Sequence, residues 1–362
     1  MPLVLHTEAS TGLGGQELRI LAEARWLGAH GWEALIACQP GSRLLAEARD
    51  AGLAAEPVPM RGAGDVRALL RLRRLMRARG VALVHTHSSA DSWPGALAAR
   101  SLGLPVVRSR HVSIPISRGG ALVYRLAHRV VTSGEAVRAI VVGAGIHAAR
   151  VVSIPAGVDT RRFHAGVSGR AVREEFGLAG GRPVVGLVAN VRGSKGHNVF
   201  LEAVRTVLGD VPGARFLIVG DGVGFDEVRR RVREAGLEPH VIMTGFRRDV
   251  PEVMAALDVL VLPSVRSEAA SQVIPQAFAV GTPVVASSIG GSPELVRDGE
   301  TGRLVPPGDA RALAAAIVAL LREPAAARAM ARSGQAMVQA RLTLDAAMER
   351  TTAVYRALLE SA

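Results

Sequence analysis

Glu268 lies between a predicted strand that ends at Pro263 and a predicted helix that begins near Ser271 and is stopped by Gly281. The free N–H groups and the dipole at the start of such a helix suit a pyrophosphate group. Pro275 falls in the first turn of the helix, where proline is tolerated. This segment is therefore the strongest candidate in the chain for binding a charged ligand.

Lys195 is the only lysine in 362 residues, although 44 residues are lysine or arginine. It follows Arg192 by three positions, in the loop after the valine-rich run at 183–190. Every other residue of this kind is arginine, so the lysine here raises the question of what an ammonium group does at this position. The alternative is a solvated loop lysine without a specific role.

Glycines gather after the first predicted strand, in the segment TGLGGQE at 11–17. Gly14 and Gly15 would let backbone N–H groups approach a phosphate or a sugar at the start of the following helix. The dinucleotide pattern G-x-G-x-x-G is not met there, because the glycines have the wrong spacing. A tight structural turn is the alternative.

A second glycine pattern favours a nicotinamide enzyme only superficially. Gly143, Gly145 and Ala148 fit G-x-G-x-x-A. The true fingerprint opens a helix after a strand, whereas the residues before Gly143 predict a helix that ends there. Asp159, the next acid that could bind a ribose, also comes too early in the chain.

Histidines end two predicted strands. His85 and His87 alternate along one strand, so their rings share a face and could converge on a metal ion. No third ligand lies near them in the sequence and no D-x-D motif occurs, so we predict no metal site. His111 ends another strand, where it would lie among functional loops, and a core or surface histidine is the alternative.

The amino-acid composition excludes some classes of binding partner and favours others. The net charge of +12 favours anionic partners, but basic clusters interleaved with stacking aromatics are missing, so no nucleic-acid role is predicted. The single cysteine, Cys38, rules out an internal disulfide. The N-terminus lacks the features of a signal peptide and no apolar run approaches 18 residues, so we expect a cytoplasmic protein.

Short valine-rich runs alternate with helical patterns along the whole chain, which predicts βαβ units and parallel sheets. We expect two doubly wound α/β domains at 1–165 and 166–342, with an irregular linker at 158–170. A last helix at 343–362 is expected to cross back to the first domain. The predicted strands are at 3–7, 33–38, 82–87, 105–111, 129–133, 151–157, 183–190, 215–222, 241–246, 259–264 and 283–288.

The segment at 263–291 resembles the signature of family-four glycosyltransferases, in which two glutamates with seven residues between them precede A-x-G-x-P-V-V. Here Glu268 is followed at that spacing by Gln276 and then by AVGTPVV. The motifs GGQE, RSRH, IPAGVD, KGH and IVGDG occur in the family's order, and the resemblance spans roughly the whole chain. It implies a GT-B fold, in which two Rossmann-like domains face each other across a cleft, and metal-independent, retaining transfer from a nucleotide-sugar donor.

The resemblance also implies roles for individual residues. Arg192 and Lys195 would neutralise the pyrophosphate of the donor, since a compact ammonium group suits a site without a metal. Glu268 would orient the sugar ring, and Gln276 would bind the ribose. The other implied contacts are Gly14, Gly15, Ser271 and Gln272 at the pyrophosphate, Phe246 at the nucleobase and His111 at the sugar near the reacting carbon.

Two positions depart from the family pattern. Asn190 stands where the family has arginine, and Arg192 would substitute for it. Gln276 replaces the second glutamate and is neutral, although it can still donate and accept hydrogen bonds. We interpret these departures as a variation that affects the choice of donor, for which a UDP-sugar is favoured.

The segment at 65–80 predicts a basic amphipathic helix. Six arginines lie between Arg67 and Arg79 without an acid among them. Such a helix can lie on an anionic bilayer, as expected if the acceptor is a lipid-linked or envelope glycan of a lipopolysaccharide or exopolysaccharide pathway. The alternative is an ordinary outer helix with a solvated basic face. The apolar contacts would come from Leu69, Leu72, Leu75 and Met76.

Three other functions remain open from the sequence. A non-catalytic sugar-nucleotide-binding protein is conceivable because of Gln276, and an NAD-linked oxidoreductase because of the glycines near 143. A sugar-nucleotide epimerase would share the architecture, but the family-four segment argues against it.

Overall fold

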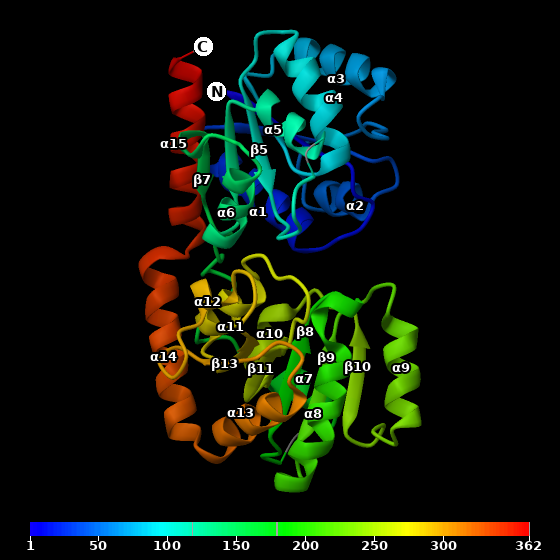
Figure 1. The fold of residues 1–362 in the computed structure, drawn as a ribbon, viewed down its shortest axis with the longest axis vertical. Helices are drawn as coiled ribbons and strands as arrows, with labels where there is room; N and C mark the ends of the chain where they lie inside the picture. The colour runs from blue at the N-terminus through cyan, green and yellow to red at the C-terminus, as the bar shows by residue number, and fades with distance from the viewer. Residues whose placement is uncertain (118, 179, 362) are drawn as a thin grey trace. The chain divides into compact units, whose positions relative to one another are not determined.

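The computed structural model describes residues 1–117, 119–178 and 180–361. The chain folds into two compact units, one of Met1–Gly157 with Leu344–Ala362 and the other of Val158–Thr343 (Figure 1). The boundary after Gly157 comes slightly earlier than the predicted one after residue 165. Each unit is a parallel sheet covered by helices, which confirms the predicted α/β class.

Unit 1 contains a seven-stranded parallel sheet with the order β3-β2-β1-β4-β5-β6-β7. Its strands are β1 (Leu3–Glu8), β2 (Glu33–Cys38), β3 (Ala55–Pro57), β4 (Leu83–Thr86), β5 (Val106–Arg110), β6 (Arg129–Thr132) and β7 (Val151–Ser153). Its helices are α1 (Gly15–Ala29), α2 (Arg43–Asp50), α3 (Val66–Arg79), α4 (Ser89–Arg100), η1 (Gly119–Ala121), α5 (Leu122–Leu126), α6 (Glu135–Gly143), η2 (Ala148–Arg150) and α15 (Leu344–Glu360).

Neighbouring residues of β1 pack into different layers of unit 1, because successive strand side chains point to opposite faces of the sheet. Leu5 belongs to the core beneath α3 and α4, together with Leu72. Val4 belongs to the core on the other face, where it packs with Leu27 of α1 and Tyr355 of α15. Helix α15 therefore forms part of the core of unit 1, although it follows unit 2 in the sequence (Figure 1).

Unit 2 contains a six-stranded parallel sheet with the order β10-β9-β8-β11-β12-β13. Its strands are β8 (Val184–Val188), β9 (Arg215–Val219), β10 (Val241–Gly245), β11 (Val259–Leu262), β12 (Val284–Ser287) and β13 (Arg303–Val305). Its helices are α7 (Arg170–Glu175), η3 (Gly193–Lys195), α8 (His197–Asp210), α9 (Phe225–Glu234), α10 (Val250–Ala256), α11 (Val273–Val280), α12 (Ser292–Leu295), α13 (Ala310–Arg322) and α14 (Pro324–Arg341).

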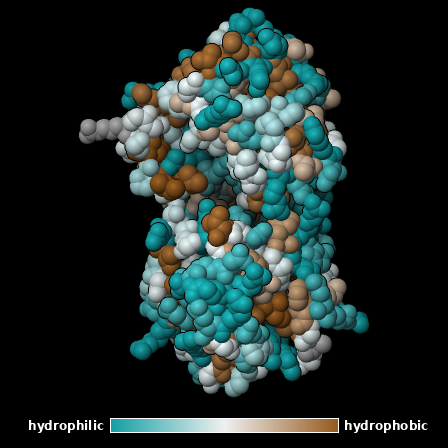
Figure 2. All heavy atoms as spheres, turned by 90° about the vertical axis from the view of Figure 1, so that its right-hand side faces the viewer, coloured by the Kyte–Doolittle hydropathy of each residue, from teal (hydrophilic) through white to brown (hydrophobic). Residues whose placement is uncertain are grey.

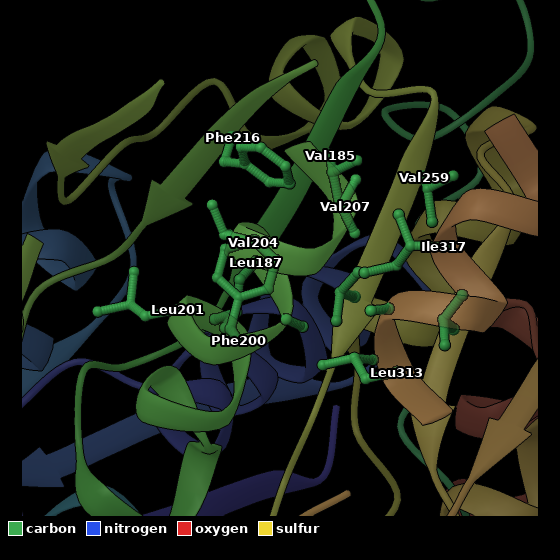
Figure 3. Close-up of a cluster of buried hydrophobic side chains, with 14 of the residues drawn as sticks. Val185, Leu187, Phe200, Leu201, Val204, Val207, Phe216, Val259, Leu313 and Ile317 are labelled. Atoms are coloured by element: carbon green, nitrogen blue, oxygen red, sulfur yellow. The ribbon is translucent and has the colours of Figure 1, made fainter. Parts of the chain in front are cut away.

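The core on one face of this sheet is shown in Figure 3. Val185 and Leu187 of β8 pack there against Phe200 of α8 and Ile317 of α13. Phe200 and Phe216 make an edge-to-face contact, with ring centroids 5.9 Å apart. These contacts hold β8 against the helices on this face of the sheet. A loop with candidate functional residues begins where β8 ends.

Strands β3 and β13 were not predicted. They have three residues each and lie at the edges of their sheets, so they lack a recognisable valine-rich run. Helix α7 begins at Arg170, the last residue of the segment that was predicted to be an irregular linker.

Candidate functional site

Most of the predicted donor-binding residues lie at one edge of the sheet in unit 2. All pairs of neighbouring strands in this sheet are parallel, so their carboxyl ends meet at the same edge. Lys195 follows β8, Phe246 follows β10 and Glu268 follows β11. Helix α11 begins a few residues after Glu268, so its N-terminus belongs to the same edge.

Lys195 and Glu268 form a largely buried ion pair. The lysine Nζ lies 2.7 Å from Glu268 Oε2, and the two side chains are 12% and 5% exposed. Ser264 Oγ donates a second hydrogen bond to the same oxygen, at 2.6 Å. The only lysine of the chain is thus held against the residue that was predicted to orient the sugar, which the sequence did not indicate.

Close backbone contacts hold the two loops that carry this pair. Gly196 has a φ of 72°, and a Cβ atom there would lie 1.8 Å from the carbonyl oxygen of Pro263 at the end of β11. Gly290 has a φ of 56°, and a Cβ there would lie 1.8 Å from the carbonyl oxygen of Glu268. Only glycine fits either position. The KGH and IGG motifs therefore fix where Lys195 and Glu268 stand.

The remaining donor-side residues lie at the surface of the same edge. Arg192 is exposed and precedes η3, where its carbonyl accepts a hydrogen bond from the N–H of Lys195. Phe246 is 38% exposed, directly after β10. Helix α11 begins at Val273 with Gln272 as its N-cap, slightly later than predicted from Ser271. Gln272 and Gln276 are four residues apart, so they share one partly exposed face of the helix start.

His197 was not predicted as a functional residue, although it follows Lys195 closely in the KGH motif. It is buried at the start of α8, and neither ring nitrogen has a partner among the described residues. Burial, with a smaller effect from the nearby Lys195 charge, lowers its pKa to about 4. A neutral imidazole beside the lysine leaves the ammonium group as the local positive charge.

In the glycine loop of unit 1, one of the two predicted phosphate-binding N–H groups already donates to a side chain of the protein. Gly14 is the N-cap of α1, and its N–H donates to Glu17 Oε2 at 2.7 Å. Gly15 is exposed at the first position of the helix. The contact of these glycines with pyrophosphate stays a prediction. For Gly14 it would require the hydrogen bond from the Gly14 N–H to Glu17 to break.

The interpretation that His85 and His87 lack a third potential ligand holds along the sequence but is wrong in space. The structure brings His6 of β1 and Glu23 of α1 to them, and one ligand atom from each of the four buried residues lies within 4.8 Å of the others. The sequence hid this cluster because His6 comes from another strand and Glu23 from the helix that covers it. His85 uses both nitrogens in hydrogen bonds, to Tyr355 Oη at 2.6 Å and to Ser109 Oγ at 2.8 Å.

His111 is bound to this cluster. Its Nε2 lies 3.2 Å from Nδ1 of His87, and the two rings are nearly parallel with centroids 5.4 Å apart. His111 is partly buried, directly after β5. Burial lowers its pKa well below the usual value, so its imidazole is neutral at pH 7.

Two buried carboxyl groups at the same edge of unit 1 were also missed. Asp91 accepts hydrogen bonds from Thr7 Oγ1 at 2.6 Å and from the N–H of His87 at 3.0 Å, which fixes the end of β4. Glu8 accepts a hydrogen bond from the N–H of Ser10 at 2.8 Å. Burial, reinforced by the charge of Asp91, raises the pKa of Glu8 to about 8.

Helix α3 presents a different surface from the predicted one. Leu72 and Met76 are buried, and Leu69 and Leu75 are partly buried against the same core, so these four residues do not form the predicted apolar surface. The exposed apolar residues are instead Val66, at 63%, and Leu70, at 54%. Arg73 donates to Ser101 Oγ, and the exposed Arg79 pairs with Glu56. The other exposed arginines of the helix are Arg67, Arg71, Arg74 and Arg77.

Two family models match the chain. Residues 13–162 match Glycosyltransferase Family 4, and residues 182–323 match Glycosyl transferases group 1. A 2-deoxystreptamine glucosyltransferase from Streptomyces kanamyceticus is 32% identical over 74% of this chain and 75% of its own length. A D-inositol 3-phosphate glycosyltransferase from Segniliparus rotundus is 30% identical over 76% of this chain and 66% of its own.

Solved structures show the same architecture. The UDP-glucose complex of Anabaena HepE superimposes with a TM-score of 0.89, at 23% identity, over 99% of this chain and 100% of that one. Sucrose-phosphate synthase from Thermosynechococcus elongatus gives a TM-score of 0.78 at 22% identity, with full coverage of both chains. The fold is therefore GT-B. The protein belongs to glycosyltransferase family 4 and is a glycosyltransferase that uses a nucleotide-sugar donor.

Proposed function

We propose that this glycosyltransferase transfers a hexosyl group from a UDP-sugar, without a metal ion and with retention of the anomeric configuration, to an envelope glycan or lipid-linked acceptor. The Lys195–Glu268 ion pair carries the proposal. It places a buried ammonium group and a carboxylate side by side at the sheet edge where α11 begins. In such a pair the ammonium group can bind a pyrophosphate, and the carboxylate can bind the hydroxyl groups of a sugar.

The charges of unit 2 support binding of the donor without a metal. The leaving nucleoside diphosphate develops negative charge, which must be stabilised by fixed positive groups. Lys195, the exposed Arg192 and the N-terminal N–H groups of α11 supply such groups within one edge of unit 2. When phosphate oxygens bind Lys195, Glu268 loses its ion-pair partner but keeps the hydrogen bond from Ser264, and its carboxylate can accept hydrogen bonds from sugar hydroxyls.

The other contacts follow from their positions. Gln276 lies one helical turn beyond Gln272 and would bind the ribose through its amide. The exposed ring of Phe246 would pack against the base. The preference for UDP is supported by likeness to HepE, which was crystallised with UDP and with UDP-glucose.

Helix α3 supports docking on an anionic membrane surface. Its exposed side carries Arg67, Arg71, Arg74 and Arg77, with Val66 and Leu70 between them. Each arginine near an anionic surface contributes about 1 kcal/mol. No described helix is long and apolar enough to cross a membrane, and the surface in Figure 2 shows hydrophobic residues in separate patches among hydrophilic ones. Attachment would then depend on charge, with a small apolar contribution.

A nucleotide panel followed by a product analysis tests the proposal. UDP, GDP, ADP and CMP are each added to the protein without metal and with EDTA, and the melting temperature is measured. We expect UDP to stabilise the fold most. The sugar released or transferred from the matching donor is then examined by NMR, where retention predicts an α product from an α-linked donor. A protein that binds the nucleotide but consumes no donor would be a binding protein instead.

A further inference from the structure

A run of imidazole rings connects the interior of unit 1 to His111. His6 Nδ1 lies 2.9 Å from His87 Nε2, and His87 Nδ1 lies 3.2 Å from His111 Nε2. The rings of both pairs are nearly parallel, with interplanar angles of 18° and 17°, and they meet edge to edge at these nitrogens. A neutral imidazole donates through one nitrogen and accepts through the other. The three rings must therefore all donate in the same direction along the run.

Glu23 sets that direction. Its carboxylate is buried on α1, with Oε1 held by Arg19 at 2.6 Å and Oε2 without a hydrogen-bond partner among the described residues. His6 Nε2 also lacks a partner there, and a ring nitrogen of His6 lies within 4.8 Å of a Glu23 oxygen. Glu23 raises the pKa of His6 more than Arg19 lowers it, although burial brings that pKa to about 4. The ring therefore stays neutral. Because Nδ1 contacts His87 and Nε2 has no partner in the described part of the chain, the nearby carboxylate favours the His6 proton on Nε2.

The rest follows from hydrogen-bond complementarity. With its proton on Nε2, His6 can only accept through Nδ1, so His87 donates to it from Nε2. His87 must then accept through Nδ1, so His111 donates from Nε2. His111 Nδ1 is left as a lone-pair acceptor, and no hydrogen bond to it is found within residues 1–117, 119–178 and 180–361.

We propose that Glu23, His6 and His87 form a positioning relay that holds His111 in the tautomer with its proton on Nε2. His111 Nδ1 then accepts a hydrogen bond from a hydroxyl group of the bound sugar. The identity of that ligand rests on the proposed function, whereas the tautomer does not. His85 lies in the same buried layer but bonds Tyr355 and Ser109, so it stands outside the relay.

The tautomer can be measured in the protein without substrate. Ring ¹⁵N shifts of histidine-labelled protein distinguish a protonated from a bare nitrogen, and a His111→Gln sample assigns the His111 signals. We expect a bare Nδ1 and a protonated Nε2 in the wild type. Glu23→Gln and His87→Leu should shift His111 toward a mixture of tautomers. His85→Leu removes an equally buried imidazole and should leave the His111 shifts unchanged. The melting temperature of every variant shows whether it is folded.

Kinetics provide the second readout, with UDP-glucose as the donor and water as the acceptor. We expect kcat to fall about tenfold or more in Glu23→Gln and His87→Leu, with KM within about twofold of the wild type and His85→Leu behaving as the wild type. An unchanged His111 tautomer in both relay variants, or an equal change in His85→Leu, would overturn the relay.

Metal analysis tests the competing use of these residues. A stoichiometric divalent metal ion in the purified protein, lost in His6→Gln, would show that the imidazole lone pairs face a metal and would also overturn the relay. The expected tautomer in a protein that consumes no nucleotide sugar would support the relay and count against the proposed function alone.

Discussion

Lys195 Nζ and Glu268 Oε2 lie 2.7 Å apart, so the only lysine of the chain and a candidate sugar-binding acid neutralise each other before any ligand binds. The pair joins loops that follow two adjacent strands, β8 and β11. Ligand binding at one partner must therefore alter the charge available at the other. The first two predictions follow from this coupling.

Lys195→Ala should weaken binding of UDP at least about tenfold, because one charge-assisted contact to phosphate contributes about 1.5–3 kcal/mol. It also leaves the buried Glu268 carboxylate without its partner, so the melting temperature should fall. Isothermal titration calorimetry measures the affinity. Arg205→Ala removes one exposed positive charge elsewhere in unit 2 and is the matched control. Unchanged UDP affinity in Lys195→Ala would exclude the phosphate role.

Glu268→Gln should abolish sugar transfer yet retain UDP affinity, because the amide cannot neutralise Lys195 and leaves its full charge for phosphate. Gln276→Ala should weaken UDP itself, since the ribose belongs to the bare nucleotide. The two variants are compared by UDP titration and by consumption of the nucleotide sugar. The same loss of UDP affinity in both would show that the two side chains do not divide donor recognition in this way.

Gly290→Ala should disturb the Glu268 loop, because its Cβ would lie 1.8 Å from the Glu268 carbonyl oxygen. Gly299→Ala is the matched control, since Gly299 also has a positive φ, 75°, but its Cβ would meet nothing within 4 Å. The shared backbone strain costs about 1–2 kcal/mol. Urea unfolding should show a larger loss for Gly290→Ala, and only that variant should lose transfer. Equal losses in both measurements would mean that the close approach does not position Glu268.

Membrane attachment should depend on the exposed arginines of α3. The protein should sediment with anionic vesicles at low salt, but not with neutral vesicles or at high salt. Replacement of Arg67, Arg71, Arg74 and Arg77 by Gln should abolish sedimentation and spare UDP binding. The control makes the same charge change on exposed arginines of unit 2, namely Arg311, Arg328, Arg332 and Arg341. If the wild type stays in solution with anionic vesicles, a soluble acceptor becomes the better hypothesis.

Acid should destabilise unit 1 through its buried histidines. Burial lowers the pKa of His85 and His87 well below 6.5 and that of His6 to about 4, so these three histidines bind more protons in the unfolded chain than in the folded one below pH 6.5. Each such group contributes stability above pH 6.5 that is lost as the pH falls, by about 1.4 kcal/mol per pH unit. The free energy of unfolding from urea titrations between pH 7 and 5 should fall less steeply in His85→Leu. An identical slope would contradict the assignment.

The loops of unit 2 could be predicted well from the sequence, because each follows a valine-rich strand and parallel strands bring such loops to one edge. That reasoning placed Lys195, Phe246 and Glu268 together. It could not show that Lys195 and Glu268 touch, since a loop's course depends on contacts such as Gly196 against Pro263.

The histidine cluster was beyond prediction for a similar reason. It requires the register between β1 and β4, which sets His6 opposite His85, and the rotation of α1 that points Glu23 inward. On α3, the periodicity identified the helix, but only the packed structure decides which leucines are covered.

Helix α15 has a consequence for how the protein is made. Tyr355 packs with Trp32 and bonds His85, so the core of unit 1 includes a segment that leaves the ribosome after all of unit 2. The ribosome adds about 5–20 residues per second. It must add the 186 residues of Val158–Thr343 before it makes α15, the last helix of unit 1. During that interval the apolar groove for α15 is uncovered. Transiently exposed apolar surface of this kind favours aggregation and chaperone binding, and unit 2 is the first part of the chain whose whole sequence is available to fold.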